Sequence, residues 1–124
     1  MISGGNVTVM VSDMDRAVRF YGEVLGLKLR ERYGDHWATV EAGDGLRIGL
    51  HPASSKYPAP GTKGGMSIGL EIDEPIRDVM RRMEAQGVRF SGPVVEGSGG
   101  LFADFEDPDG NRLYLWDTQA AVKH

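Results

Sequence analysis

The fold is decided by residues 6–17, which read NVTVMVSDMDRA. Val7, Val9 and Val11 occur at every second position, so the three valines fall on one face of an extended segment. Alternation with a period of two is typical of a β-strand that has one buried face. Residues 6–11 are therefore expected to form a half-buried strand.

A helix is expected directly after this strand. Ser12 followed by Asp15 resembles a capping box, with Asp in place of the usual Glu. The apolar residues that follow recur at the i, i+3, i+4, i+7 spacing of one helical stripe: Ala17, Phe20, Tyr21 and Val24. Gly26 has the position of a glycine that ends a helix. Three further strands are predicted at residues 27–33, 37–42 and 46–51, with glycine-containing turns between them.

The second half of the chain repeats this order. Adding 61 to Val7 and Gly26 gives Ile68 and Gly87, which have the same places in a second strand and at the end of a second helix. Pro75 suits the first position of that helix. The predicted elements are a strand at 67–72, a helix from 75 to 86, and strands at 88–95, 101–106 and 112–116.

An internal repeat of this kind determines the architecture. We expect an α+β fold of two tandem βαβββ modules within a single domain spanning residues 1–124. Module one covers residues 5–51, a linker rich in Pro, Ser and Gly covers 52–65, and module two covers 66–117. One face of each sheet packs on its helix, and the other faces would curve around a shared interior, which is the natural place for a ligand.

Composition excludes several classes of protein. The 124 residues carry a net charge of −4, which argues against the basic surface of a nucleic-acid-binding protein. Cysteine is absent, so disulfides and thiolate metal sites are excluded. No apolar run reaches the roughly 20 residues of a membrane helix, and no signal peptide is visible. We therefore expect a cytoplasmic protein with no nucleic-acid or membrane partner.

Two motifs resemble one known family. Residues 6–17, together with Phe20-Tyr21 and residues 25–27, are similar to the opening of vicinal oxygen chelate (VOC) proteins, and residues 107–111, DPDGN, resemble their closing signature. This superfamily includes glyoxalase I, bleomycin-resistance proteins and extradiol dioxygenases. The resemblance implies a U-shaped mixed sheet around a cavity, with one helix per module outside and frequent homodimers. It also implies that the enzymes of the family use a divalent metal to chelate two vicinal oxygens.

The residues at the family's four metal-ligand positions are Asn6, Gly49, Ser67 and Tyr114, with Met66 in place of Ser67 if that strand slips by one residue. None is an imidazole or carboxylate, the ligands that catalytic sites for such metals need. We therefore predict that the family metal is absent and that no cofactor is required. A relocated site using His51 and Glu71 is the alternative, and these two are the candidate catalytic residues. His51 could equally be an ordinary surface or hydrogen-bonded histidine.

Alternation places a mixed set of side chains on the face turned toward the expected cavity. Glu71 and Asp104 there would favour a cationic ligand and Arg47 an anionic one, unless Arg47 and Glu71 pair with each other. The aromatic residues could stack on a planar ligand, or only fill space. The predicted ligand-binding residues are Asn6, Thr8, Trp37, Arg47, His51, Ser67, Glu71, Phe102, Tyr114 and Trp116.

Three functions are compatible with these residues. The first is a glyoxalase/bleomycin-resistance-like protein that sequesters or carries a small, aromatic molecule without the family metal. The second is a lyase, isomerase or dioxygenase with a relocated metal or a metal-free acid–base site at His51 and Glu71. The third is an interaction module with a vestigial cavity.

Overall fold

The computed structural model describes residues 1, 5–43, 45–55, 59–61, 66–97 and 99–119. The chain forms two compact units: unit 1 comprises Met1–Gly61 and Pro108–Gly110, and unit 2 comprises Thr62–Asp107 and Asn111–His124. No helix in the described part of the chain is long and apolar enough to cross a membrane.

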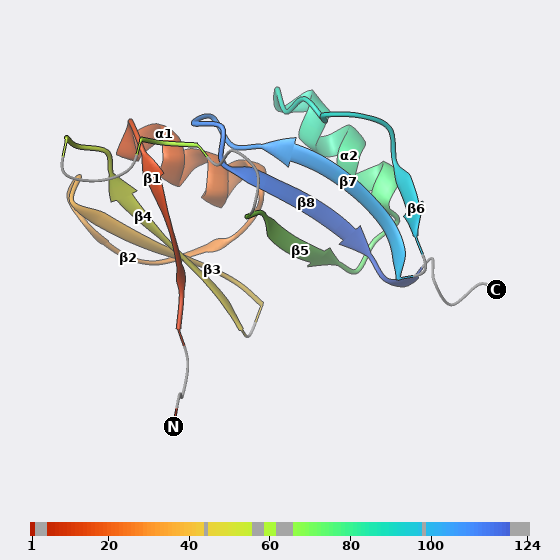
Figure 1. The fold of residues 1–124 in the computed structure, drawn as a ribbon, viewed down its shortest axis with the longest axis horizontal. Coiled ribbons are helices and arrows are strands. Elements are labelled where there is room, and N and C mark those ends of the chain that lie inside the picture. The colour runs from red at the N-terminus through yellow and green to blue at the C-terminus, as the bar shows by residue number, and fades with distance from the viewer. Residues whose placement is uncertain (2–4, 44, 56–58, 62–65, 98, 120–124) are drawn as a thin grey trace. The chain divides into compact units, whose positions relative to one another are not determined.

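Unit 1 contains a four-stranded mixed sheet with a helical segment on one face (Figure 1). The strand order is β1-β4-β3-β2, with β1 parallel to β4 and the other pairs antiparallel. The α-helix continues directly into one short π-helical segment. The elements are β1 (Val7–Val11), α1 (Met14–Arg19), η1 (Phe20–Val24), β2 (Lys28–Tyr33), β3 (Trp37–Ala42) and β4 (Leu46–Pro52).

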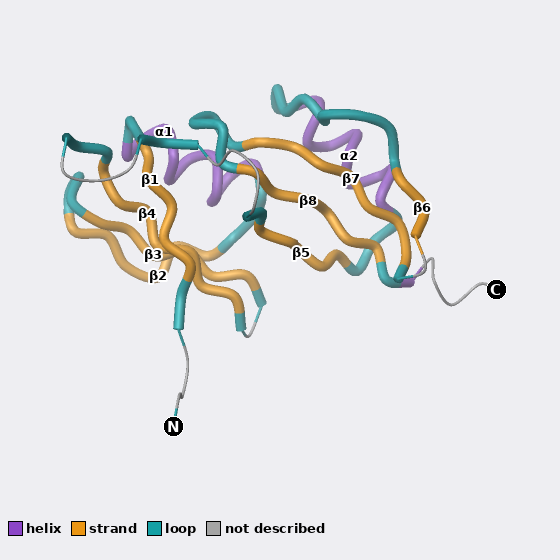
Figure 2. Tube along the Cα trace, in the orientation of Figure 1, coloured by secondary structure: helices purple, strands orange, loops and turns teal. Residues whose placement is uncertain are grey.

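Unit 2 repeats this arrangement strand for strand (Figure 2). Its order is β5-β8-β7-β6, again with one parallel pair, β5 with β8, and two antiparallel pairs. The α+β class and the repeated βαβββ unit are thus confirmed, whereas one shared interior stays a prediction. The elements are β5 (Ile68–Ile72), α2 (Ile76–Ala85), β6 (Val95–Gly97), β7 (Gly100–Glu106) and β8 (Arg112–Asp117).

Each unit buries the sheet face that its helix covers. In unit 1 the valines Val9 and Val11 are buried, as the alternation predicted, and Tyr21 is fully enclosed with Phe20 edge-on at 5.4 Å between ring centroids. In unit 2 the equivalent layer contains Phe105 and Leu113, each 1% exposed. Burial of such side chains stabilises a fold by about 1.5–3 kcal/mol apiece. The opposite sheet faces therefore carry the side chains that do not build the core.

The start of α1 differs from the prediction. Asp13, not Ser12, is the N-cap, since its carboxylate accepts a hydrogen bond from the Arg16 backbone N–H at 3.0 Å. The backbone N–H of Ser12 instead donates to Asp109 in the turn between β7 and β8, and its hydroxyl donates to Asp109 Oδ1 at 2.5 Å. The Arg16 guanidinium joins them at 3.2 Å from Asp109. The predicted Ser12–Asp15 capping box is thus wrong, because a distant carboxylate satisfies Ser12.

The strand predicted at residues 88–95 is also wrong. Only an isolated bridge between Phe90 and Phe105 precedes β6, which begins at Val95. The Ser91 N–H still donates to the Asp104 carbonyl at 2.8 Å. Pro93 has no N–H to continue such a ladder, so the chain leaves the sheet edge until β6. The departure of this segment from β7 opens the cavity described next.

Candidate functional site

The face of the unit 2 sheet opposite α2 carries an aromatic cluster. Phe102 and Asp104 project from β7, and their direct cross-strand partners on β8 are Trp116 and Tyr114. Neighbouring positions on the same strands, such as Ala103 and Leu115, are buried in the core. Alternation along both strands therefore directs the aromatic set away from α2.

Three rings of this face lie against one another. Phe102 and Trp116 are nearly parallel, with an interplanar angle of 10° and centroids 6.2 Å apart. Phe102 and Tyr114 are tilted by 58° at 6.1 Å. The Trp116 indole N–H donates to the Gly99 carbonyl at 2.9 Å, which holds the indole in its orientation. The result is an aromatic cluster in which two rings are nearly parallel and the third is tilted, and one hydrogen bond holds the indole.

A glycine on the neighbouring strand lets one ring lie low on the sheet. Gly69 on β5 is the register partner of Tyr114, and a Cβ at Gly69 would overlap the Tyr114 ring and hydroxyl. The phenol therefore occupies the space above β5 that a side chain at position 69 would need. This arrangement extends the aromatic surface across β7, β8 and β5.

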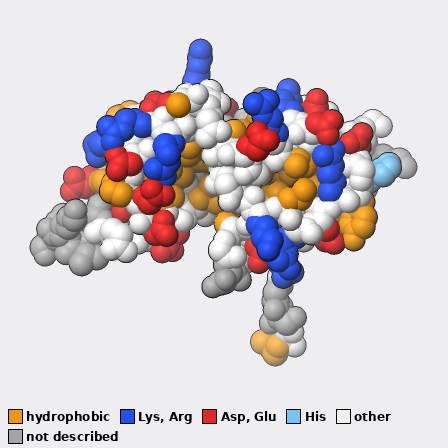
Figure 3. Space-filling model, turned by 180° about the vertical axis from the view of Figure 1, so that it is seen from behind, with side chains coloured by type: hydrophobic (Ala, Val, Ile, Leu, Met, Phe, Trp, Pro, Cys, Tyr) orange, Lys and Arg blue, Asp and Glu red, His pale blue; other side chains and the backbone are white. Residues whose placement is uncertain are grey.

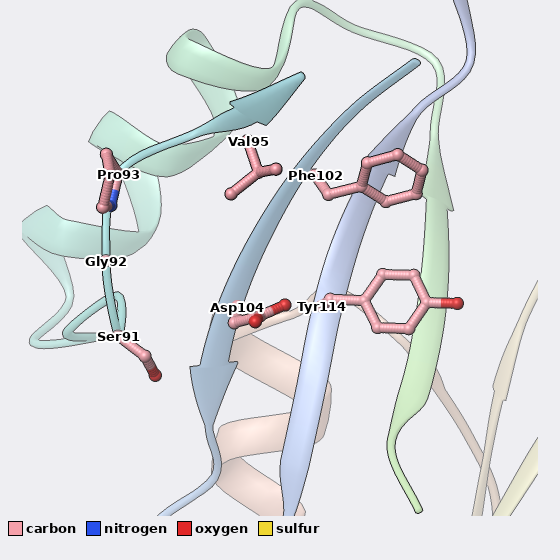
Figure 4. Close-up of a pocket in the computed structure, with 7 residues that line it drawn as sticks. All are labelled: Ser91, Gly92, Pro93, Val95, Phe102, Asp104 and Tyr114. Atoms are coloured by element: carbon pink, nitrogen blue, oxygen red, sulfur yellow. The ribbon is translucent and has the colours of Figure 1, made fainter. Parts of the chain in front are cut away.

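A cavity of about 370 Å³ opens beside this surface (Figure 4). In the close-up, Phe102 and Tyr114 extend in the same direction from neighbouring strands, and the segment before β6 forms the opposite wall. The volume lies in the range of small-molecule pockets, roughly 300–1,000 Å³. The lining residues are Ser91, Gly92, Pro93, Val95, Phe102, Asp104 and Tyr114.

Sequence reasoning found part of this lining and missed the rest. The alternation of side chains predicts Phe102 and Tyr114 as ligand-binding residues and places Asp104 on the same face. It misses residues 91–95, because it assigns them to a strand. The usable signal was the Ser91-Gly92-Pro93 sequence, which is typical of a turn.

Of the other predicted site residues in unit 2, the structure places Glu71 on β5 opposite Trp116. Ser67 precedes β5 and is exposed. Neither residue lines the cavity.

On the face of the unit 1 sheet opposite α1, the central aromatic residue is Trp37. Its indole N–H donates to the Thr39 hydroxyl at 2.7 Å, and that hydroxyl lies 3.4 Å from the Glu31 carboxylate. The Tyr33 hydroxyl donates to the second Glu31 oxygen at 2.9 Å. This hydrogen bond and the charge of Glu31 raise the pKa of the Tyr33 phenol.

Trp37 also covers a glycine. Gly49 on β4 is buried, and a Cβ at this position would overlap two carbons of the Trp37 ring. This pair resembles Tyr114 over Gly69 in unit 2, so each unit lays an aromatic ring over a glycine of an adjacent strand. Thr8 on β1 pairs with Gly49 in register, and Asn6 lies just before that strand.

His51 lies at the end of β4 in unit 1. Its Nδ1 is 2.9 Å from the Pro52 carbonyl oxygen, and its ring meets Trp37 edge-on at 6.3 Å. Because a carbonyl only accepts, this contact is a hydrogen bond when Nδ1 carries the proton. Glu71, its predicted partner, belongs to unit 2.

Arg47 has its ion-pair partner on the adjacent strand. Its Nε lies 3.8 Å from Glu41 Oε2, and Arg30 Nε lies 3.2 Å from the same oxygen. The Glu41 side chain is only 15% exposed, so two guanidinium groups compensate one partly buried carboxylate. Arg47 is therefore engaged within unit 1.

The residues at the family metal-ligand positions do not fit a divalent ion. A ligand side chain at position 49 would collide with the Trp37 ring, and Tyr114 lies flat over Gly69. Within the described ranges, no group of three or more His, Asp or Glu side chains is placed to hold a metal. The donor set is thus neutral amide, hydroxyl and phenol, which suits such ions poorly.

Charged side chains of both signs are distributed over the surface. Acidic and basic side chains lie intermixed on the face that Figure 3 presents. The net charge of −4 adds no basic field that would attract a polyanion.

Comparisons with known proteins agree on one superfamily. The family model described as Glyoxalase/Bleomycin resistance protein/Dioxygenase superfamily matches residues 5–115. The chain is 31% identical over 118 residues to the glutathione transferase FosA of Serratia marcescens, covering 89% of this chain and 77% of the relative. It is 27% identical over 113 residues to the lactoylglutathione lyase of Haemophilus influenzae, covering 83% of each.

The fold is also similar to that of a solved antibiotic-binding protein. The crystal structure of TnmS3 from Streptomyces sp. CB03234 matches with a TM-score of 0.78 and 28% identity, over 95% of this chain and 97% of that chain. The relatives thus include two named as enzymes and one named as an antibiotic-binding protein.

Proposed function

The chain belongs to the Glyoxalase/Bleomycin resistance protein/Dioxygenase superfamily, and we propose that it binds a small planar aromatic molecule in the unit 2 cavity without the family metal. The observation that carries this proposal is the cavity of about 370 Å³ beside the Phe102, Tyr114 and Trp116 rings. Its role would be to sequester or carry that molecule.

The aromatic surface supports a planar ligand. Offset stacking on a ring contributes about 0.5–1.5 kcal/mol beyond the burial of its area. The Phe102 and Trp116 rings are already parallel, so a flat ligand needs no rearrangement to lie along them. The likeness to TnmS3, named as an antibiotic-binding protein, supports the same class of function.

Two relatives are named as enzymes, so metal content separates the alternatives. We expect protein purified and dialysed against Zn²⁺, Ni²⁺ or Mn²⁺ to retain far less than one ion per chain by elemental analysis, because the family positions hold Asn6, Gly49, Ser67 and Tyr114. A content near one ion per chain would contradict metal-free binding. It would favour an enzyme with relocated ligands, of which His51 is the leading candidate.

The ligand-binding test uses a neutral tricyclic probe, acridone, titrated by calorimetry and by tryptophan fluorescence. Phe102→Ala is expected to weaken binding by about tenfold, since it removes the ring that contacts both other aromatics. Tyr33→Ala is the matched control, an exposed aromatic that does not line the cavity. Equal affinities for the wild type and Phe102→Ala, with both folded by circular dichroism, would place the ligand elsewhere.

A further inference from the structure

We propose that the unit 2 cavity selects a cationic aromatic molecule over a neutral one of the same shape, an inference that rests on the proposed function. The selecting group is the Asp104 carboxylate. Among the described residues that line the cavity, it is the one charged side chain. The ligand class would be a planar ring system that carries a positive charge on or beside the ring.

Asp104 is placed where a ligand stacked on the aromatic surface would meet it. It shares β7 with Phe102 and is the cross-strand partner of Tyr114. In Figure 4 its carboxylate lies between β7 and β8, beside the base of the Tyr114 side chain. Its backbone carbonyl accepts from the Ser91 N–H at 2.8 Å, which anchors the opposite wall of the cavity to this residue. Asp104 thus provides the carboxylate of the cavity and also binds the segment that forms its opposite wall.

The Asp104 charge is not compensated within the described residues. No ion pair or side-chain hydrogen bond involves its carboxylate there, whereas the carboxylates of Glu31 and Glu41 in unit 1 each have a partner. Glu41 in unit 1, for comparison, is held by Arg30 and Arg47. A carboxylate that lines a pocket without a protein cation has its charge available for a ligand.

The internal repeat provides a comparison for this position. Thr39 pairs with Gly49 in unit 1 as Asp104 pairs with Tyr114 in unit 2, so the two residues are equivalent. Thr39 accepts a hydrogen bond from Trp37 and is 7% exposed, whereas Asp104 is exposed. The equivalent place in unit 1 is therefore neutral and satisfied within the protein, and only unit 2 carries a charge there.

Two attractions would act on the same cation. Ring faces attract positive charge through their quadrupole, and an exposed carboxylate attracts it directly. Each effect is modest at a solvent-accessible site, so a preference of about threefold to tenfold is expected in dilute buffer. The net charge of −4 acts in the same direction at longer range. Added salt should reduce the preference, because exposed charges are screened.

The experiment compares two probes of nearly the same shape, 9-aminoacridine, which is a cation at neutral pH, and neutral acridone. Calorimetric titrations would use the wild type, Asp104→Asn and Glu106→Gln. Glu106 is the matched control, because it shares the strand and the face of Asp104 but does not line the cavity. We expect wild type and Glu106→Gln to prefer the cation by threefold to tenfold. Asp104→Asn should lose most of that preference while its acridone affinity changes by less than about twofold.

The outcomes separate this inference from the proposed function. If acridone binds and 9-aminoacridine binds no more tightly, cation selection is wrong and aromatic binding stands. A preference that survives in Asp104→Asn also overturns the assignment to Asp104. If neither probe binds any of the folded proteins, the proposed function fails together with the inference.

Discussion

Replacing Gly100 by Ala is expected to destabilise the protein by about 3–5 kcal/mol, combining backbone strain with overpacking. Gly100 begins β7 with φ +133°, a conformation that L side chains rarely adopt. A Cβ there would also overlap the Asp117 carbonyl oxygen. That carbonyl belongs to β8, and Asp117 Oδ2 accepts from the Ile76 N–H at 3.1 Å at the start of α2. The Asp117 backbone cannot move away easily, because β8 pairs with β7 and the Asp117 side chain is bonded to the start of α2.

Substitutions at two other glycines distinguish the cost of backbone strain from the cost of steric overlap. Gly87 has φ +95° but open space around its Cβ position, so Gly87→Ala should cost only the strain, about 1–2 kcal/mol. Gly92 has neither feature, and Gly92→Ala should be close to neutral. The measurement is urea denaturation followed by circular dichroism. A Gly100→Ala variant no less stable than Gly87→Ala would show that β8 yields to the added methyl group.

The sequence predicted well the features that depend on local periodicity. Alternation identified the uncovered sides of β7 and β8, including Phe102 and Tyr114, because strand side chains have a strict period of two. The repeat was visible for the same reason, since Val7 and Ile68 have the same role in equivalent strands.

Features that depend on contacts across the chain could not be predicted in this way. The bond between Ser12 and Asp109 joins residues 97 positions apart, and no local pattern distinguishes it from a capping box. The aromatic–glycine pairs depend on strand register, which is set by the complete sheet. The cavity wall at residues 91–95 depends on where the chain leaves β7, and Pro93 marks that place only approximately.

The second large effect is expected at Gly49, where an added methyl group should destabilise unit 1 by about 1–3 kcal/mol. A Cβ at this position would overlap the Trp37 ring, which is held by its hydrogen bond to Thr39 at 2.7 Å. In a Trp37→Ala background the same Gly49→Ala change should cost less than about 0.5 kcal/mol, because the obstructing ring is gone. Urea denaturation of the wild type, the two single variants and the double variant gives the coupling energy between the two positions.

Gly69→Ala is the control for this cycle, because its Cβ would meet Tyr114 and not Trp37. Its cost should add to that of Trp37→Ala within about 0.5 kcal/mol. Additive costs for Gly49→Ala and Trp37→Ala would mean that the indole moves aside freely, and the steric argument would then be wrong.

The same geometry leaves no room for a larger side chain at position 49 while the Trp37 ring is in place. Glutamate or histidine at position 49 would need its first side-chain atom where the Trp37 ring lies. A single Gly49→Glu change is therefore expected to reduce stability at least as much as Gly49→Ala and to gain no zinc in equilibrium dialysis. Only a variant that also lacks Trp37 has room for a carboxylate there. The packing of the Trp37 ring over Gly49 thus leaves room for an indole or for a larger side chain at position 49, and not for both.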